Sequence, residues 1–361
     1  MISLSTRAAT IKPMVFIISM FKSEEGVWHS IPEFDLLAQN ITVPGFSPIF
    51  PEAHCTLDGS ICQLVTGEAE INAASTISAL VHSSSFDLTT TYFLIAGIAG
   101  INPKVSTIGS VTFARYAVQV ALQYEFDARE IPSGWSTGYF PQGAYAPDQY
   151  PRNIYGTEVF EVNDALRQLA IGFAKIATLV DSDAAGISRS NYANDSIFAA
   201  AIQPPSVVAC DTATSDVYWT GALLGEAFEN TTVLFTNGTG SYCSNQQEDN
   251  ALESLLRATI AGLVDFSRII IMRTASDWDR PYDDQTPYDN IFGAKPGHDI
   301  AVQNLYVAGI KVIEGILDGW SETFEQGVVA QNYIGDIFGS LGGEPDFGPG
   351  SIFGSSAPTT K

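Results

Sequence analysis

The chain has 361 residues, 45% of them hydrophobic and 16% charged, which describes a folded protein large enough for one big domain or two. Seventeen basic residues against forty acidic ones give a formal net charge of −23. Nucleic acids and anionic membranes are bound through basic surfaces, so this balance argues against both kinds of partner. It also makes free phosphate, an anion, a poor co-substrate.

The first apolar run covers residues 14–21, and we interpret residues 15–20 as a buried strand. The alternative, the hydrophobic part of a signal peptide, lacks a small-residue cleavage site after it. No apolar run reaches the roughly 18–20 residues of a membrane-spanning helix, so no membrane span is expected.

Strand and helix patterns alternate along the chain, which favours a mixed sheet with helices on both faces. The elements predicted after the first strand are a helix over 67–82, a strand over 92–96 ended by the glycine-rich residues 97–100, a strand over 111–116, a helix over 161–180, a helix over 248–265, a strand over 268–273 and a helix over 300–324. Residues 134–155 are rich in Pro, Gly and Tyr and are interpreted as an insertion or a lid-like loop. We therefore expect an N-terminal extension over 1–12, a single domain over 13–338 and a loosely packed Gly/Pro-rich tail over 339–361.

Cysteines and glycosylation tripeptides indicate the compartment. Cys55 and Cys62 bracket an Asp58-Gly59 turn, which favours a local disulfide and leaves Cys210 with Cys243, although four cysteines allow three pairings. Four Asn-x-Ser/Thr tripeptides begin at Asn40, Asn194, Asn230 and Asn237. Together these features predict a secreted glycoprotein.

The buried-looking strand over 268–273 stops on small polar residues and a carboxylate, Asp277. In an open α/β sheet, ligands bind at the carboxyl ends of strands. An acid placed there can give a proton to a leaving group, and Asp277 is the candidate. The structural alternative is an aspartate that caps a turn.

Four other segments carry candidate chemistry. Glu24 and Glu25 follow the first strand, residues 67–74 form a small-residue turn that starts a helix, residues 97–100 end another strand, and Glu248 and Asp249 open a helix. Taken singly, each has a plain explanation, because acids are common in loops and at helix N-termini and small residues allow close packing. Their order along the chain carries more information than any one of them.

In this order the segments resemble the nucleoside phosphorylase/nucleosidase superfamily. Nearly the whole chain resembles, more closely, the fungal family of purine nucleoside permeases, with distinctive phrases at residues 31–44 and 333–343. The resemblance implies an α/β fold, a three-layer α/β/α sandwich around a mixed, partly barrel-like sheet of the nucleoside phosphorylase-like kind.

The resemblance also implies roles for particular residues. Asp277 would be the general acid at the purine, and Arg273 would orient water or balance the carboxylates. Glu24, with Glu25 as a rival, would position water. The residues that would bind substrate are Glu248, Asp249, Gly97, Ala99, Gly100, Tyr218, Trp219 and Ser276. Three departures are visible. Gln247 stands where methionine is usual, Ile98 stands where a hydroxyl residue is usual, and the gap from Glu248 to Asp277 is longer than in compact bacterial members of the superfamily.

A purine anion leaves ribose readily only when it is protonated, while the sugar becomes cationic and is stabilised by carboxylate. We expected Glu24, Glu248 and Asp279 to surround Asp277 with negative charge, so that it keeps its proton. The sequence thus predicts a purine nucleosidase that hydrolyses adenosine, guanosine or inosine. Phosphorolysis in the same pocket is one alternative, and a soluble nucleoside-binding component of uptake is another.

No cofactor or metal is expected. His29, His54, His82 and His298 are scattered without the spacing of metal ligands, and no glycine-rich loop with lysine is present to hold nucleotide phosphates. The purine nucleoside substrate is the expected partner, and a homodimer is compatible with the sequence.

Overall fold

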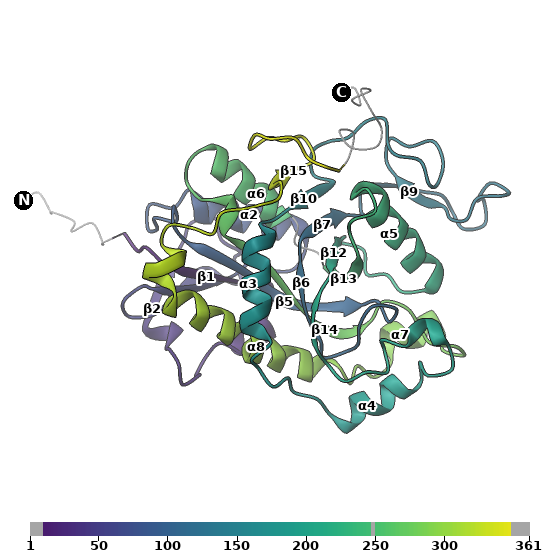
Figure 1. The fold of residues 1–361 in the computed structure, drawn as a ribbon, viewed down its shortest axis with the longest axis horizontal. Coiled ribbons are helices and arrows are strands. Elements are labelled where there is room, and N and C mark those ends of the chain that lie inside the picture. Colours follow the sequence, from purple (N-terminus) through teal and green to yellow (C-terminus); the bar gives the residue numbers. More distant parts are fainter. Residues whose placement is uncertain (1–9, 247–249, 348–361) are drawn as a thin grey trace, which may run out of the picture.

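The computed structural model describes residues 10–246 and 250–347, and thirteen strands counted over this part join in one mixed sheet (Figure 1). At its centre β1 (Val15–Ser19) runs parallel to β4 (Ile61–Val65) and to β5 (Tyr92–Ile101), and β5 runs parallel to β14 (Ile269–Trp278). Every residue of β1 and β4 is buried. Apart from Ser19 and Gln63 the two strands are apolar, and such buried runs are typical of parallel strands covered on both faces.

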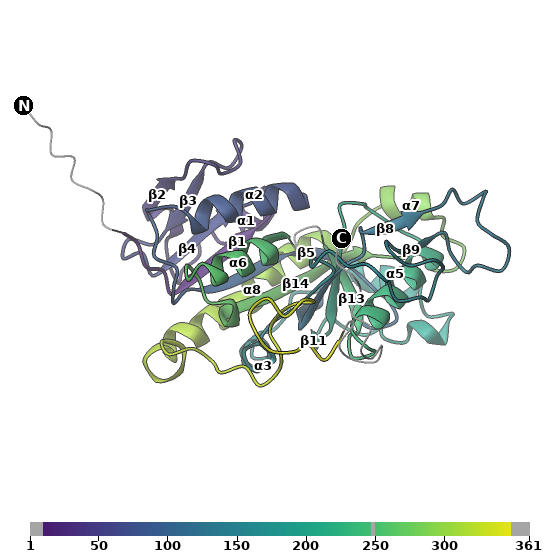
Figure 2. The same cartoon turned by 90° about the horizontal axis from the view of Figure 1, so that it is seen from above.

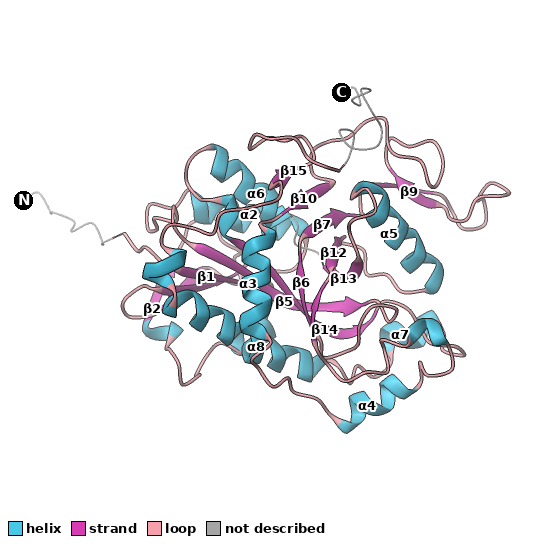
Figure 3. Ribbon diagram, in the orientation of Figure 1, coloured by secondary structure: helices cyan, strands magenta, loops and turns pink. Residues whose placement is uncertain are grey.

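The other strands are shorter. The remaining members of the large sheet are β2 (Gln39–Thr42), β3 (Glu52–Cys55), β6 (Val111–Ala114), β7 (Tyr116–Gln119), β10 (Val159–Glu161), β11 (Val207–Ala209), β12 (Asp211–Thr214), β13 (Tyr242–Gln246) and β15 (Gly335–Asp336). Strands β8 (Gln123–Glu125) and β9 (Tyr139–Pro141) form a separate hairpin beside α5 (Ala222–Phe235) (Figure 3).

Two pairs of helices cover the sheet, one on each face (Figure 2). Helices α2 (Glu70–Val81) and α6 (Asn250–Ile260) pack together, as do α3 (Asp164–Ala174) and α8 (His298–Asp318). The sheet has a hydrophobic core on each face, and alternate residues of β1 point into one or the other. Phe16 and Ile18 belong to the first core, and Val15 and Ile17 belong to the second. The predicted three-layer arrangement is confirmed. The smaller helices are α1 (Lys22–Gly26), α4 (Asp183–Ser190), α7 (Pro287–Phe292) and a π-helical turn over Trp320–Phe324.

The sheet also closes partly on itself, as the resemblance implied. Strand β5 pairs with β13 as well as with β14, β13 leads through β12 to β7, and β14 leads to β6. Only Arg115 separates β6 from β7, so the two ladders meet there. Buried Asp211 holds this corner, because one carboxylate oxygen accepts the N–H groups of Arg115 (3.0 Å) and Tyr116 (2.9 Å).

A buried ion pair lies next to this corner. Glu161 has no exposed side-chain surface and accepts a hydrogen bond from Arg115 Nε at 2.6 Å and one from Asn332 at 2.7 Å. Burial raises the pKa of Glu161 to about 7, against the smaller opposing effects of Asn332 and Arg115.

Glu161 should make stability depend on pH. Its pKa is higher in the folded state than in the unfolded chain, so the folded state binds more protons between pH 5 and 8 and loses stability as the pH rises. We expect this group to lower the free energy of unfolding by about 2–3 kcal/mol across that range. Urea unfolding at pH 5 and pH 8 should show the loss in the parent protein and a smaller one in Glu161→Gln. Exposed Glu130→Gln is the control. If the free energy of unfolding falls by the same amount from pH 5 to pH 8 in the parent and in Glu161→Gln, the prediction is contradicted.

Several boundaries differ from the predictions. The strand expected to stop at residue 273 continues to Trp278, so Asp277 lies within β14 and not after its end. Strand β5 runs on to Ile101 instead of stopping at Gly97, and the expected strand over 111–116 is split at Arg115 into β6 and β7. Helix α3 starts only after Asn163, whose side chain accepts the N–H of Leu166 as an N-cap. Within the expected loose tail, Phe347 is fully buried against Tyr116 and Tyr333, whereas residues 342–344 and 346 are exposed.

One helix in the described part of the chain, α8, is long and apolar enough to cross a membrane, so the expectation that no segment reaches that length is wrong. Just over half of its apolar window, 56%, is buried inside this fold. It packs against α3, β14 and β5, which is how the core helix of an α/β domain behaves.

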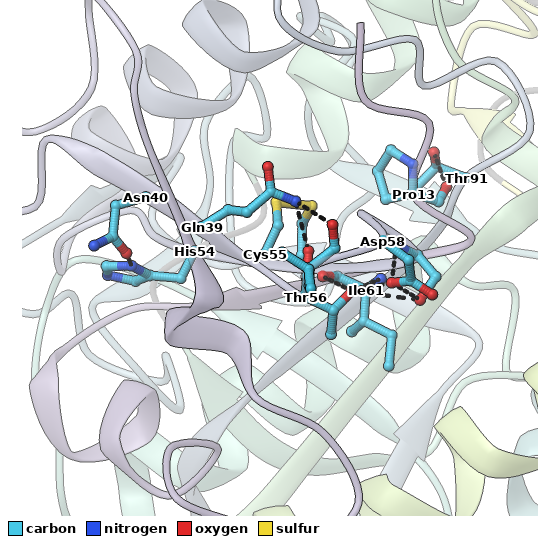
Figure 4. Close-up of a disulfide and its surroundings, with 12 residues drawn as sticks. Pro13, Gln39, Asn40, His54, Cys55, Thr56, Asp58, Ile61 and Thr91 are labelled. Carbon is cyan, nitrogen blue, oxygen red and sulfur yellow. Dashed lines mark hydrogen bonds between the residues drawn. A yellow bond between two sulfur atoms is a disulfide. The ribbon is translucent and has the colours of Figure 1, made fainter. Parts of the chain in front are cut away.

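Both favoured disulfides are present. Cys55–Cys62 joins directly paired residues of β3 and β4 and lies close to Gln39 and Thr56 (Figure 4). Cys210–Cys243 joins the segment that enters β12 to β13. Within the described residues no cysteine is free.

The longer disulfide loop should contribute more stability. Cys210–Cys243 spans 33 residues and Cys55–Cys62 spans 7, and a cross-link stabilises by restricting the unfolded chain. We expect Cys210→Ser/Cys243→Ser to lower the free energy of unfolding by about 3–4 kcal/mol and Cys55→Ser/Cys62→Ser by about 2–3 kcal/mol. Urea unfolding of the two double variants tests the order, and a larger loss for the second pair would contradict it.

Candidate active site

A cavity of about 410 Å³ opens at the carboxyl ends of the central parallel strands. Its wall comes from segments that follow β1 and β4, from the ends of β5, β13 and β14, and from the loops after β12 and α7. This is the position at which ligands bind in open α/β sheets, and the volume lies in the range of small-molecule sites.

Glu24 enters the cavity from α1, one turn after β1. Its side chain is almost completely buried, and its two carboxylate oxygens accept the backbone N–H groups of Met20 and Ile98, each at 2.7 Å. Glu25, the rival, points elsewhere and lies 3.4 Å from His54 Nε2. The structure therefore brings Glu24 to the cavity and leaves Glu25 outside its wall.

The end of β5 forms the floor beside Glu24. Ala99 and Gly100 line the cavity, as does Ile98. Gly97 lies behind this wall, where an added Cβ would stand 2.3 Å from Arg273 Nη1 and 2.6 Å from Glu24 Oε1. Glycine is required at 97 because two charged side chains pack against its Cα, not because the strand turns there.

A β-bulge in β14 aims two consecutive side chains at the cavity. Ala275 pairs with Ala99 and Asp277 with Gly100, so Ser276 is the extra residue. Without the bulge, Ser276 and Asp277 would point to opposite faces of the strand. With it, both line the cavity, and Ser276 Oγ donates to the carbonyl oxygen of Ala99 at 3.1 Å.

Asp277 has a cationic partner that the sequence analysis missed. Lys295 Nζ lies 2.7 Å from Asp277 Oδ2 and 2.8 Å from the backbone oxygen of Asn290, and Lys295 also lines the cavity. The expectation that Asp279 adds negative charge here is wrong. Asp279 is fully buried away from the cavity wall, where its carboxylate accepts hydrogen bonds from Arg280 and from the Tyr242 hydroxyl at 2.8 Å.

Two aromatic residues after β12 line the cavity as predicted for base contacts. Tyr218 is exposed at the rim, whereas Trp219 is only 7% exposed and packs edge-on against Phe228. Trp219 Nε1 has no hydrogen-bond acceptor among the described residues. A buried indole N–H is normally satisfied, so this donor suits a ligand in the cavity.

Two asparagines in the wall were also missed. Asn245 Oδ1 accepts the N–H of Gly100 at 2.7 Å, and Asn290 Nδ2 donates to the carbonyl oxygen of Trp278 at 2.9 Å. These contacts fix the orientation of both amides. Neither position carries a motif, because each reaches the cavity only through the tertiary fold. Phe292 and His298 are further lining residues of this kind, whereas Glu68 comes from the small-residue turn over 67–74.

Arg273 is buried behind the cavity wall, with Nη1 about 4.0 Å from Met20 Sδ. Glu248 and Asp249, the predicted ribose-binding acids, lie outside the described residues. In the described part, no cluster of three or more His, Cys, Asp or Glu side chains could hold a metal ion.

The family profile described as "Purine nucleoside permease (NUP)" matches residues 12–329. The chain belongs to the purine nucleoside permease family. Among its relatives, a purine nucleoside permease of Candida albicans is 46% identical over 351 residues, covering 95% of this chain and 85% of that protein. A probable purine nucleoside permease of Schizosaccharomyces pombe is 43% identical over 326 residues, covering 87% of this chain and 92% of the other.

Solved structures with a similar arrangement include two bacterial enzymes. A 5'-methylthioadenosine/S-adenosylhomocysteine nucleosidase of Streptococcus pneumoniae has a TM-score of 0.49 at 14% identity, covering 85% of this chain and 100% of that one. A futalosine hydrolase of Helicobacter pylori has a TM-score of 0.47 at 13% identity, covering 86% and 98%.

In this member of the purine nucleoside permease family the four glycosylation tripeptides differ in accessibility. Asn40, Asn194 and Asn230 are exposed, whereas Asn237 is half-buried. The Asn40 side chain contacts His54 Nδ1 at 2.7 Å, and Asn230 donates to Asp148 at 2.6 Å.

The expected lid over 134–155 does not line the cavity.

Proposed function

We propose that this protein hydrolyses the N-glycosidic bond of purine ribonucleosides such as adenosine, guanosine and inosine. The observation that carries the proposal is the placement of buried Glu24 and the Asp277–Lys295 pair in the wall of one cavity. Cleavage of a glycosidic bond needs a proton for the leaving group and a carboxylate for water and the cationic sugar. These residues can supply both.

The charges around the cavity favour water over phosphate as the attacking group. Three carboxylates line it, those of Glu24, Glu68 and Asp277, and the lysine is already paired. A carboxylate already lies at the N-terminus of α2, a kind of position that can bind phosphate. There the N–H of Glu70 donates to Asp216 Oδ1 at 2.8 Å. An incoming phosphate would meet negative charge where a phosphorylase needs positive charge.

Product analysis tests the proposal. The protein is incubated with adenosine, guanosine or inosine in phosphate-free buffer, and free base and ribose are measured by chromatography. We expect equal amounts of base and ribose, unchanged when phosphate is added. Ribose 1-phosphate formed only with phosphate would identify a phosphorylase instead. Tight nucleoside binding by calorimetry without any base release would identify a binding component of transport, as the relatives' names suggest.

We further propose that the protein acts on nucleosides outside the cell. Two disulfides support an oxidising compartment, and three exposed sequons, those of Asn40, Asn194 and Asn230, support glycosylation. Expression in a eukaryotic host should release the protein into the medium in a form whose mass falls on endoglycosidase treatment. Retention inside the cell without glycan would contradict this proposal.

A further inference from the structure

Lys295 lies in the loop between α7 and α8 and lines the cavity beside Asp277. Its ammonium group has three N–H donors. One is directed at Asp277 Oδ2 (2.7 Å) and a second at the backbone oxygen of Asn290 (2.8 Å). A third donor is left for an acceptor in the cavity, and the side chain is 30% exposed there.

Asp277 and Lys295 form an ion pair, with Lys295 Nζ 2.7 Å from Asp277 Oδ2. A carboxylate that accepts a hydrogen bond from an ammonium group is ionised, and charge-assisted bonds of this type are the strong ones. Ser276 Oγ lies 3.3 Å from Asp277 Oδ1, but its single O–H also has the carbonyl oxygen of Ala99 within reach at 3.1 Å. The contact with the Lys295 ammonium group is the one that suits a carboxylate at Asp277.

We propose that Lys295 is the general acid of the hydrolysis and that ionised Asp277 holds it in place. This inference rests on the proposed function. As the C1'–N9 bond breaks, its electron pair passes to the purine, and N7 takes a proton from Lys295 Nζ. Water adds to C1' and loses a proton to the Glu24 carboxylate. The neutral amine left on Lys295 is then reprotonated as Glu24 releases its proton to solvent, so nucleoside and water give purine and ribose.

An alkylammonium ion is a suitable proton donor for a departing purine. The conjugate acid of a purine anion and an alkylammonium ion are weak acids of comparable strength, so the proton moves only once the glycosidic bond is well on the way to breaking. Glu24, Glu68 and His298 also line the cavity. Two of these three are carboxylates, whose negative charge attracts an ammonium group.

Two substrates and two variants test the assignment. Adenosine needs a proton on its leaving group, whereas 4-nitrophenyl β-D-ribofuranoside releases a stable phenolate without one. Lys295→Met removes the charge and the proton. Lys295→Arg keeps a positive charge for Asp277, but a guanidinium group does not release its proton. Exposed Lys175→Met, at the end of α3, is the matched control.

We expect both Lys295 variants to hydrolyse adenosine about 10²–10⁴-fold more slowly than the parent, while hydrolysis of the nitrophenyl riboside stays within a few-fold. Arginine that restores adenosine hydrolysis would show that only the charge matters and would overturn the assignment. Equal losses on both substrates would overturn it too, since they indicate a structural role. A parent protein that cleaves neither substrate would refute the proposed function itself, a result distinct from both.

Discussion

Replacing Asp277 with alanine should lower the turnover of adenosine by about 10²–10⁴-fold, the usual contribution of acid–base assistance. The carboxylate lines the cavity and accepts a hydrogen bond from the Lys295 ammonium group at 2.7 Å. Its loss removes the group that holds the proton donor next to the leaving base. Initial rates in phosphate-free buffer, measured as released adenine over a range of adenosine concentrations, check this expectation.

The fold should survive this change, because the Asp277 side chain is 30% exposed and lies at the end of its strand. Thermal unfolding of Asp277→Ala should therefore give a midpoint close to that of the parent. Exposed Asp283→Ala, from the loop that follows, is the control for altered net charge. Near-normal turnover by Asp277→Ala would remove the residue from the mechanism.

The sheet and its covering helices follow from local patterns. The runs at 15–18 and 269–272 are apolar at every position, which favours helices on both faces, and α2 has the periodicity of a half-buried helix. The end of β5 was mispredicted because glycine is read locally as a strand breaker. At Gly97 the requirement is set by Arg273 and Glu24, which come from distant parts of the chain.

The residues of the candidate site divide in the same way, into those placed by a local pattern and those placed only by the tertiary fold. Asp277 and Glu24 directly follow or end buried strands, so their position at the rim could be predicted from the sequence. Lys295, Asn290 and Asn245 could not, because a loop lysine and two amides have no periodicity and reach the cavity only when α7 and β13 are packed. The bulge at Ser276 is equally hidden, since it is defined by pairing with β5.

Glu24→Gln should lower adenosine turnover by about 10²–10⁴-fold, through the loss of the carboxylate that accepts a proton from water. Both oxygens of Glu24 accept backbone N–H groups, so the amide of glutamine must turn its NH₂ group toward one of these donors. That mismatch leaves a buried donor unpaired and should also cost about 1–3 kcal/mol of stability. Rates in phosphate-free buffer and urea unfolding measure the two effects separately.

Glu25→Gln is a closely matched control, since it makes the same chemical change one residue away. Glu25 faces His54 at 3.4 Å and does not line the cavity. We expect it to keep turnover within a few-fold of the parent. If Glu25→Gln instead loses activity and Glu24→Gln keeps it, the water-positioning role belongs to the neighbouring acid. Loss in Glu24→Gln alone, measured well below the temperature at which either variant unfolds, would assign the activated water to the wall formed by α1 and the end of β5.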